Sequence, residues 1–179
     1  MGTDLPPLMA IAATNDSQNA YEVGKIVAKE SRSVGVHWNF SPVVDVNNNP
    51  LNPIINVRSF SEDPNIVSEF GIQYMKGLQD HGMLATAKHF PGHGDTETDS
   101  HSSLAMIPSD SLRLWSIEIP PFQALIDSDI DAVMIAHVHA PDYQPDSDTP
   151  ASMSPFWVNN ILKNKIGFKG AIVTDGMGM

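Results

Sequence analysis

The sequence contains no cysteine, few basic residues and no long apolar run, and each shortage excludes a class of protein. Without cysteine, the chain has no disulfide framework, no thiolate nucleophile and no cysteine-ligated zinc. Ten Lys and Arg residues against 21 Asp and Glu residues give a net charge of −11. Because the basic residues are scattered rather than clustered, we expect no nucleic-acid partner.

A membrane span needs about 20 consecutive apolar residues, and no stretch of the chain approaches that length. The N-terminus also lacks the basic segment and the long apolar core of an export signal. We therefore expect a soluble protein without a membrane span. The sequence leaves open whether it is cytoplasmic or exported.

The chain has 179 residues, of which 41% are hydrophobic and 17% charged, as expected for one globular domain or part of one. Short apolar runs alternate with segments of helical periodicity, which is the pattern of βα units built on a parallel sheet. The predicted strands are Leu8–Ala13, Val36–Val46, Leu84–His89, Asp131–Val138 and Gly170–Asp175. The predicted helices are Ser17–Ser33, Pro64 to about Asp80, a segment after Pro108 that Pro120 and Pro121 interrupt, and Pro155–Ile166.

This pattern predicts an α/β fold, a TIM-like (β/α) barrel of which the chain is an incomplete portion with about four to five βα units. The apolar runs at 132–136 and 171–173 predict strands that are buried on both faces, as in a parallel sheet or barrel. An eightfold barrel needs about 250 residues, so we expect flanking sequence to supply the remainder. A small doubly wound domain is the alternative, but it would leave the strand before Asp175 without a following helix.

Ionisable residues follow the predicted strands, at the edge where both kinds of α/β fold place their active sites. Lys88 and His89 end one strand, and Asp175 ends another, where an unpaired carboxylate is costly unless it has a function. Arg58 lies in the loop after an earlier strand, where its donors could hold sugar hydroxyls or a carbonyl. The structural alternatives are a core histidine at 89, a surface cation at 88, and a surface ion pair of Arg58 with Glu62 or Asp63.

The segment 90–101 combines a tight turn with a polar loop. Phe90–Gly94 packs one proline and two glycines into five residues, which indicates a constrained backbone close to a ligand or to another segment. Asp99 and His101 lie two residues apart and could pair, and a carboxylate raises the basicity of a histidine and fixes its tautomer. The alternative is a plain hydrophilic loop.

Taken in order, the motifs SPVVDV, RSFSEDP, KHFPGHG, DSH, AHV and VTDG resemble glycoside hydrolase family 3, in its β-N-acetylglucosaminidase branch. The resemblance covers nearly the whole chain and implies that residues 1–179 are part of the N-terminal catalytic barrel domain. It also implies a bacterial retaining hydrolase that cleaves terminal β-linked N-acetylglucosamine, for example from peptidoglycan fragments during recycling. The implied partner is a carbohydrate substrate, and no cofactor and no metal are expected.

The resemblance implies a role for each matching residue. Asp175 would be the nucleophile, and His101 would be the acid/base, oriented by Asp99. Arg58, Lys88 and His89 would hold the hydroxyls and acetamide of the sugar. A neutral imidazole does not repel an incoming anion, so phosphate could replace water as the acceptor, which makes phosphorolysis a secondary hypothesis.

The sequence departs from the family pattern in two ways, and one is that nothing matches the family strands before Leu8 or after Asp175. Leu8–Ala13 resembles a family strand that normally ends in an acidic, glycine-rich motif that binds sugar, whereas Thr14–Ser17 follows here. We therefore expect an incomplete site, and the chain by itself could fail to fold or to turn over substrate.

Three other functions remain as alternatives to the acetamido hydrolase. One is a family 3 hydrolase of the β-glucosidase type. Another is a metal-dependent barrel hydrolase, with ligands drawn from His89, His93, His137, His139 and Asp175. The third is a non-catalytic sugar-binding module that uses Trp38, Trp115 and Trp157 as stacking faces.

Overall fold

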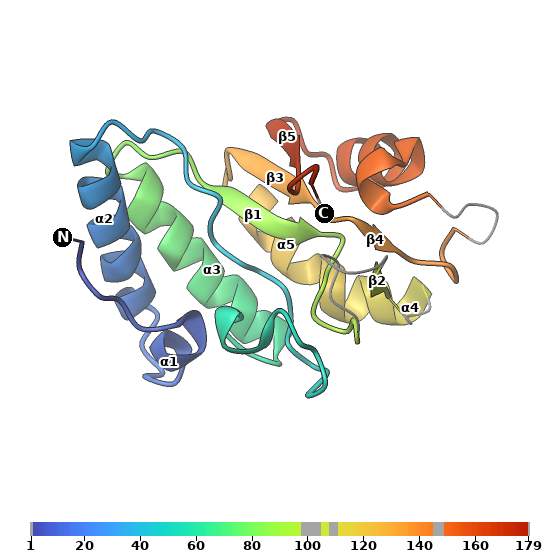
Figure 1. Cartoon of the computed structure of the whole chain (residues 1–179), viewed down its shortest axis with the longest axis horizontal. Helices are drawn as coiled ribbons and strands as arrows, with labels where there is room; N and C mark the ends of the chain where they lie inside the picture. Colours follow the sequence, from blue (N-terminus) through green and yellow to red (C-terminus); the bar gives the residue numbers. More distant parts are fainter. Residues whose placement is uncertain (1, 98–104, 108–110, 145–148, 179) are drawn as a thin grey trace.

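A computed structural model of the chain describes residues 2–97, 105–107, 111–144 and 149–178 (Figure 1). Its centre is a three-stranded parallel sheet in the order β1-β3-β5. The strands are β1 (Thr86–Phe90), β3 (Ala132–Ile135) and β5 (Ala171–Thr174). Thr86 lies opposite Ala132, which in turn lies opposite Ala171. Because the strands are parallel and in this order, their carboxyl ends meet at one edge.

The segment predicted as the strand Val36–Val46 runs parallel to β1 without forming a continuous strand. Isolated bridges join Trp38 to Leu84 and Val43 to Lys88. Between the bridges, the amide of Thr86 donates to the carbonyl of Ser41, and the amide of Lys88 donates to that of Pro42. Pro42 has no N–H to donate in return, which interrupts the regular ladder. The segment still brings its last residues to the same edge as the end of β1.

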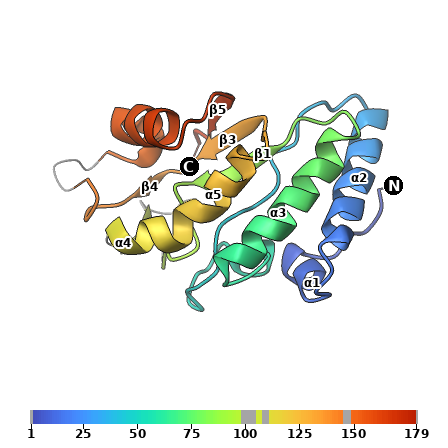
Figure 2. The ribbon, with the colours of Figure 1, turned by 180° about the vertical axis from the view of Figure 1, so that it is seen from behind.

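Helices cover one face of this arrangement, as Figure 2 shows from behind. They are α2 (Gln18–Ser33), α3 (Pro64–Gln79) and α5 (Ile119–Ile126), and α3 packs between the other two. Glycines let α2 and α3 approach closely, because a Cβ atom at Gly77 would lie 2.2 Å from the carbonyl oxygen of Tyr21. Asp63 caps α3 by accepting a hydrogen bond from the amide of Asn65.

The later helices depart from regular α-helical geometry. A short turn α4 (Ser111–Arg113) runs into the π-helical segment η2 (Leu114–Glu118), which continues as α5 with prolines in its first turn. The helix before β5 is the π-helical segment η4 (Phe156–Lys165). The predicted break at Pro120 and Pro121 is thus a change of helix type, since proline is tolerated in a first helical turn.

The remaining elements are short. β2 (Ala105–Met106) and β4 (Val138–His139) form a separate parallel pair, so the predicted strand Asp131–Val138 is divided into β3 and β4. The 3₁₀ turns η1 (Asn56–Arg58) and η3 (Ala151–Met153) lie in loops. No helix in these ranges is both long and apolar enough to cross a membrane.

The prediction of a strand at Leu8–Ala13 is wrong, because this segment forms the helix α1 (Leu8–Ala12). Short apolar runs do not distinguish a strand from a buried helical turn by periodicity. The residues of this run, LMAIA, are mostly strong helix formers, and Pro7 stands at the N-cap. Ile11 and Ala12 are buried in the core.

In the described residues, the segment 171–173 is less buried than predicted. β3 is buried throughout, whereas in β5 Ala171 is exposed and Ile172 and Val173 are half-buried. The difference arises because β3 has a strand on each side and β5 pairs with β3 alone. In the described residues, β5 is therefore an edge strand.

Candidate active site

The most buried group of the site is a carboxylate, Asp45, at the end of the segment beside β1. It is 1% exposed and accepts hydrogen bonds from the amides of His89 and His93, the latter at 2.8 Å. The ring of His89 donates from Nδ1 to Asp45 Oδ2 at 2.7 Å, since a carboxylate can only accept. Burial raises the pKa of Asp45, but the two histidines and these hydrogen bonds outweigh it and hold the pKa below its ordinary value.

Asp45 fixes the orientation of the His89 ring, and this aims the other ring nitrogen at the end of β5. His89 Nε2 lies 4.0 Å from Asp175 Oδ2. The side chain of Asp175 is 25% exposed, and its Oδ1 accepts a hydrogen bond from the amide of Gly176. The predicted neighbours His89 and Asp175 therefore do meet, at the shared carboxyl edge of β1 and β5.

The turn after β1 is held by Asn52, which lies in the loop that follows Asp45. The side-chain amide of Asn52 donates to the carbonyls of His93 and Gly94, and its oxygen accepts from the amides of Ile54 and Ile55. The backbone itself lies very close, because a Cβ atom at Gly94 would be 1.8 Å from the carbonyl oxygen of Val46. The tight turn that the glycines and proline predict is thus wedged against the loop that carries Asp45.

Lys88 and Arg58 line an open cleft of about 270 Å³ together with Pro6, Pro7, Leu8, Ser41 and Val43. Burial lowers the pKa of Lys88, and the Arg58 charge lowers it further, whereas Asp175 and Asp45 oppose the shift. Arg58 is exposed and donates to the carbonyl of Ile54. The alternative ion pair of Arg58 with Glu62 or Asp63 does not form among the described residues.

Two predicted site residues, Asp99 and His101, lie outside the described residues. Their pairing and their distance from Asp175 remain predictions. The structure brings Lys88, His89 and Asp175 together, with Arg58 beside Lys88 in the adjoining cleft.

The whole chain, residues 1–179, matches the family model described as the glycosyl hydrolase family 3 N terminal domain. The chain belongs to glycosyl hydrolase family 3. It is 40% identical over 183 residues to a beta-hexosaminidase from Stenotrophomonas maltophilia strain K279a, covering 99% of this chain and 53% of that protein. This family 3 chain therefore spans about half the length of that relative.

Solved structures agree with this assignment. The structure of a glycoside hydrolase family 3 beta-N-acetylglucosaminidase from Paenibacillus sp. str. FPU-7 matches with a TM-score of 0.97 and 42% identity, over 99% of this chain and 34% of that one. A beta-glucoside phosphorylase, BglX, matches with a TM-score of 0.96 and 33% identity, over 99% of this chain and 33% of that one. The predicted α/β fold, a portion of a TIM-like barrel, is confirmed.

Asp45 is a residue of this family 3 site to which the sequence alone assigns no role. Its signal is a carboxylate directly after two buried valines, Val43 and Val44, where burial demands partners. The identity of those partners depends on the fold, because His89 and His93 lie more than 40 residues away along the chain.

Among the histidines considered as metal ligands, His89 contacts the Asp45 carboxylate, whereas His93 and His137 contact hydroxyl or carbonyl groups. In the described ranges no group of His, Asp and Glu side chains is arranged to hold a metal ion. His137 contacts the hydroxyl of Ser152 at 2.6 Å, and its other ring nitrogen lies 3.3 Å from the carbonyl of Gly176. His93 contacts the hydroxyl of Thr96 at 2.6 Å, and burial lowers its pKa.

The tryptophans are poorly placed for stacking on sugars. Trp157 is 1% exposed and stacks on Tyr143. Lys165 lies over the ring of Trp115, 3.7 Å from its centroid. Trp38 is more exposed, and its Nε1 donates to the hydroxyl of Thr86.

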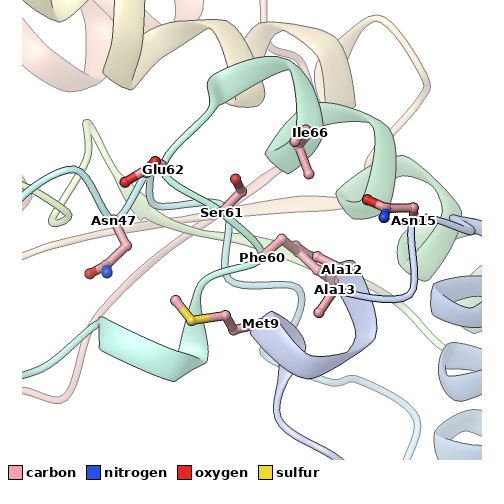
Figure 3. Close-up of a pocket in the computed structure, with 9 residues that line it drawn as sticks. All are labelled: Met9, Ala12, Ala13, Asn15, Asn47, Phe60, Ser61, Glu62 and Ile66. Carbon is pink, nitrogen blue, oxygen red and sulfur yellow. The ribbon is translucent and has the colours of Figure 1, made fainter.

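A larger cleft, of about 340 Å³, lies between α1 and the start of α3 and contains none of the predicted site residues (Figure 3). Its floor combines Phe60 with small residues of α1, and polar side chains stand around it. The lining residues are Met9, Ala12, Ala13, Asn15, Asn47, Phe60, Ser61, Glu62 and Ile66.

Proposed function

We propose that the protein containing this chain is a retaining glycoside hydrolase that releases terminal β-linked N-acetylglucosamine, from glycosides such as peptidoglycan fragments. The observation that carries the proposal is the position of Asp175. This carboxylate ends a strand, remains partly open to solvent and lies 4.0 Å from a histidine whose ring a buried carboxylate orients. The names of the relatives support the same sugar.

In the proposed mechanism Asp175 attacks the anomeric carbon, and the bond from that carbon to the leaving oxygen breaks. His101, oriented by Asp99, gives its proton to the leaving oxygen. It then removes a proton from the water that hydrolyses the glycosyl-enzyme. Arg58, Lys88 and His89 hold the sugar, and the cleft beside Lys88 supports this assignment.

The test is hydrolysis of an aryl β-N-acetylglucosaminide by the complete gene product, with the matching aryl β-glucoside as the competing substrate. We expect Asp175→Asn to lower kcat by roughly 10⁴-fold or more, and His101→Ala to lower it strongly as well. Asp127→Asn is the control, because Asp127 is exposed and its side chain pairs with Gln123 of its own helix. Wild-type rates in both site variants would contradict the mechanism, and a preference for the glucoside would contradict the substrate.

Phosphorolysis is the second candidate function, favoured by the likeness to a beta-glucoside phosphorylase. A neutral His101 would not repel a phosphate anion that approaches the glycosyl-enzyme. Adding inorganic phosphate to the assay should then yield N-acetylglucosamine 1-phosphate. An unchanged product spectrum would leave hydrolysis as the activity.

A further inference from the structure

Glu118 is a buried acidic residue for which the proposed mechanism has no use. It ends the π-helical segment η2 and is 1% exposed. It packs directly beneath the turn after β1, because a Cβ atom at Gly92 would lie 2.8 Å from Glu118 Oε2. Only a glycine fits there, and Gly92 also has a φ of +135°.

The side chain of Glu118 meets that of Asn48, whose Nδ2 donates to Glu118 Oε1 at 3.3 Å. The second oxygen of each side chain, Glu118 Oε2 and Asn48 Oδ1, is buried without a hydrogen-bond partner in the described ranges. Two such orphan acceptors in adjoining side chains are costly. A proton on Glu118 would convert one of them into a donor, and the acid and the amide could then close a two-bond pair.

The charges around Glu118 favour this protonated form. The pKa of Glu118 is raised to about 8. Burial is the largest cause, and the negative charges of Asp45 and Asp95 act in the same direction. Asn48 and Arg113 act in the opposite direction, but Arg113 is also paired with Asp95 at 2.9 Å. An apolar site can keep a carboxylic acid neutral at pH 7 so that it serves as a hydrogen-bond donor.

We propose that Glu118 carries a proton at neutral pH and pairs with Asn48, and that it acts as a positioning residue for the turn between β1 and Asp95. The pair ties the 46–49 segment, which follows Asp45, to the helix beneath Gly92. The same turn supplies the His93 amide to Asp45, and Asp45 orients His89. The effect of Glu118 on catalysis rests on the function proposed above, whereas its protonation does not.

The first test measures protonation without reference to activity. The native pKa near 8 lies above the ordinary value of 4.5, so the native state holds one more proton than the unfolded state between these values. The stabilisation is complete below pH 4.5 and is lost as the pH rises through 8. In urea titrations of the complete gene product, the unfolding constant of wild type relative to Glu118→Gln should rise by about tenfold per pH unit from about pH 5 to 8. If the unfolding constants of wild type and Glu118→Gln change with pH by the same factor, the proposal is overturned.

Infrared spectra of the wild type at about pH 6 and pH 9 keep the proposal testable should Glu118→Gln fail to fold. Ordinary carboxyl groups are ionised at both values. The carbonyl band of a protonated carboxylic acid, present at the lower pH and lost at the higher, is the expected result. Absence of such a band at the lower pH would show that Glu118 is ionised.

The second test concerns catalysis. The amide of Glu118→Gln can reproduce both bonds to Asn48, so its kcat at about pH 6.5 should stay within about twofold of wild type, whereas Glu118→Ala should lose about tenfold or more. Above about pH 8 the wild-type rate should fall more steeply than that of Glu118→Gln. A low kcat in Glu118→Gln near pH 6.5, or identical profiles in the alkaline range, would overturn the positioning role. Absence of glycosidase activity in all variants, with the urea result intact, would refute the proposed function instead.

Discussion

Two aspartates reach the site at the shared edge of the sheet, Asp45 beside the end of β1 and Asp175 after the end of β5, but the fold holds them in opposite ways. Asp45, beside the end of β1, is fully buried and accepts from the amides of two residues and from the His89 ring. Asp175, after β5, is 25% exposed and accepts a hydrogen bond from the adjacent Gly176. One carboxylate is fixed by the fold, and the other is available to a ligand.

This difference fits the supporting role that we infer for Asp45 and the reacting role that we propose for Asp175. A buried polar group is costly unless it is hydrogen-bonded, so a carboxylate that the fold holds in one geometry has several hydrogen-bond partners. A nucleophile needs an open face toward the substrate. We infer that the β1 end contributes mainly to stability and orientation, and that the β5 end contributes little to stability.

The largest expected effect on stability comes from exchanging the two aspartates for asparagine in turn. Asp45→Asn should lower the free energy of unfolding by about 4 kcal/mol, because it replaces a buried, hydrogen-bonded carboxylate with an amide whose N–H groups face N–H donors. Asp175→Asn should change it by less than about 0.5 kcal/mol. Urea titration of both variants near pH 7 measures the two changes in the free energy of unfolding. Equal changes would contradict the difference between the two aspartates.

A smaller effect on stability is expected from adding one methyl group to the turn after β1, compared with adding one after β5. Gly94→Ala should cost about 2–3 kcal/mol, since the new Cβ atom would overlap the carbonyl of Val46 and push the turn away from Asp45. Gly178→Ala is the matched control, because nothing in the part of the chain that the structure describes lies within 4 Å of the corresponding Cβ position. Thermal unfolding of the two variants gives the comparison, and a stable Gly94→Ala protein would show that the turn can move freely.

The smallest expected effect is a loss of stability at acidic pH, which arises from Asp45 beside the end of β1. The native pKa of Asp45 is lowered, so the stability that its charge provides is present above the ordinary value of 3.8 and is lost as the pH falls below it. Wild type should lose stability relative to Asp45→Asn by up to about 1.4 kcal/mol per pH unit in that range. Denaturant titrations from about pH 6 to pH 3 test this, and a constant difference between the two proteins would contradict it.

The fold is most predictable from the sequence where a physical rule acts locally. The start of α3 follows from Asp63 and Pro64, and the apolar run at 132–135 predicts β3. The prediction at Leu8–Ala12 is wrong because a five-residue apolar run fits either a strand or a helical turn. The predicted burial of β5 is not seen in the described residues, where β5 has β3 as its neighbour on one side, and an apolar sequence does not reveal how many neighbours a strand has.

The site residues at the strand ends can be predicted from the sequence, whereas the buried residues that support them are harder to predict. Lys88, His89 and Asp175 can be identified because polar residues that follow buried strands in a parallel sheet meet at one edge. The partnership of Asp45 with His89 and the burial of Glu118 depend on contacts between distant segments. Nothing in the helical pattern around Glu118 distinguishes it from a solvated glutamate.

The close contact between α2 and α3 has a consequence for how the sequence can vary. A Cβ atom at Gly24 would lie 2.3 Å from the carbonyl of Tyr74, and one at Gly77 would lie 2.2 Å from that of Tyr21. The two backbones therefore interlock without any side chain between them. A protein engineer could replace most of the exposed residues of α2, but substituting either glycine would force the two backbones apart at this contact.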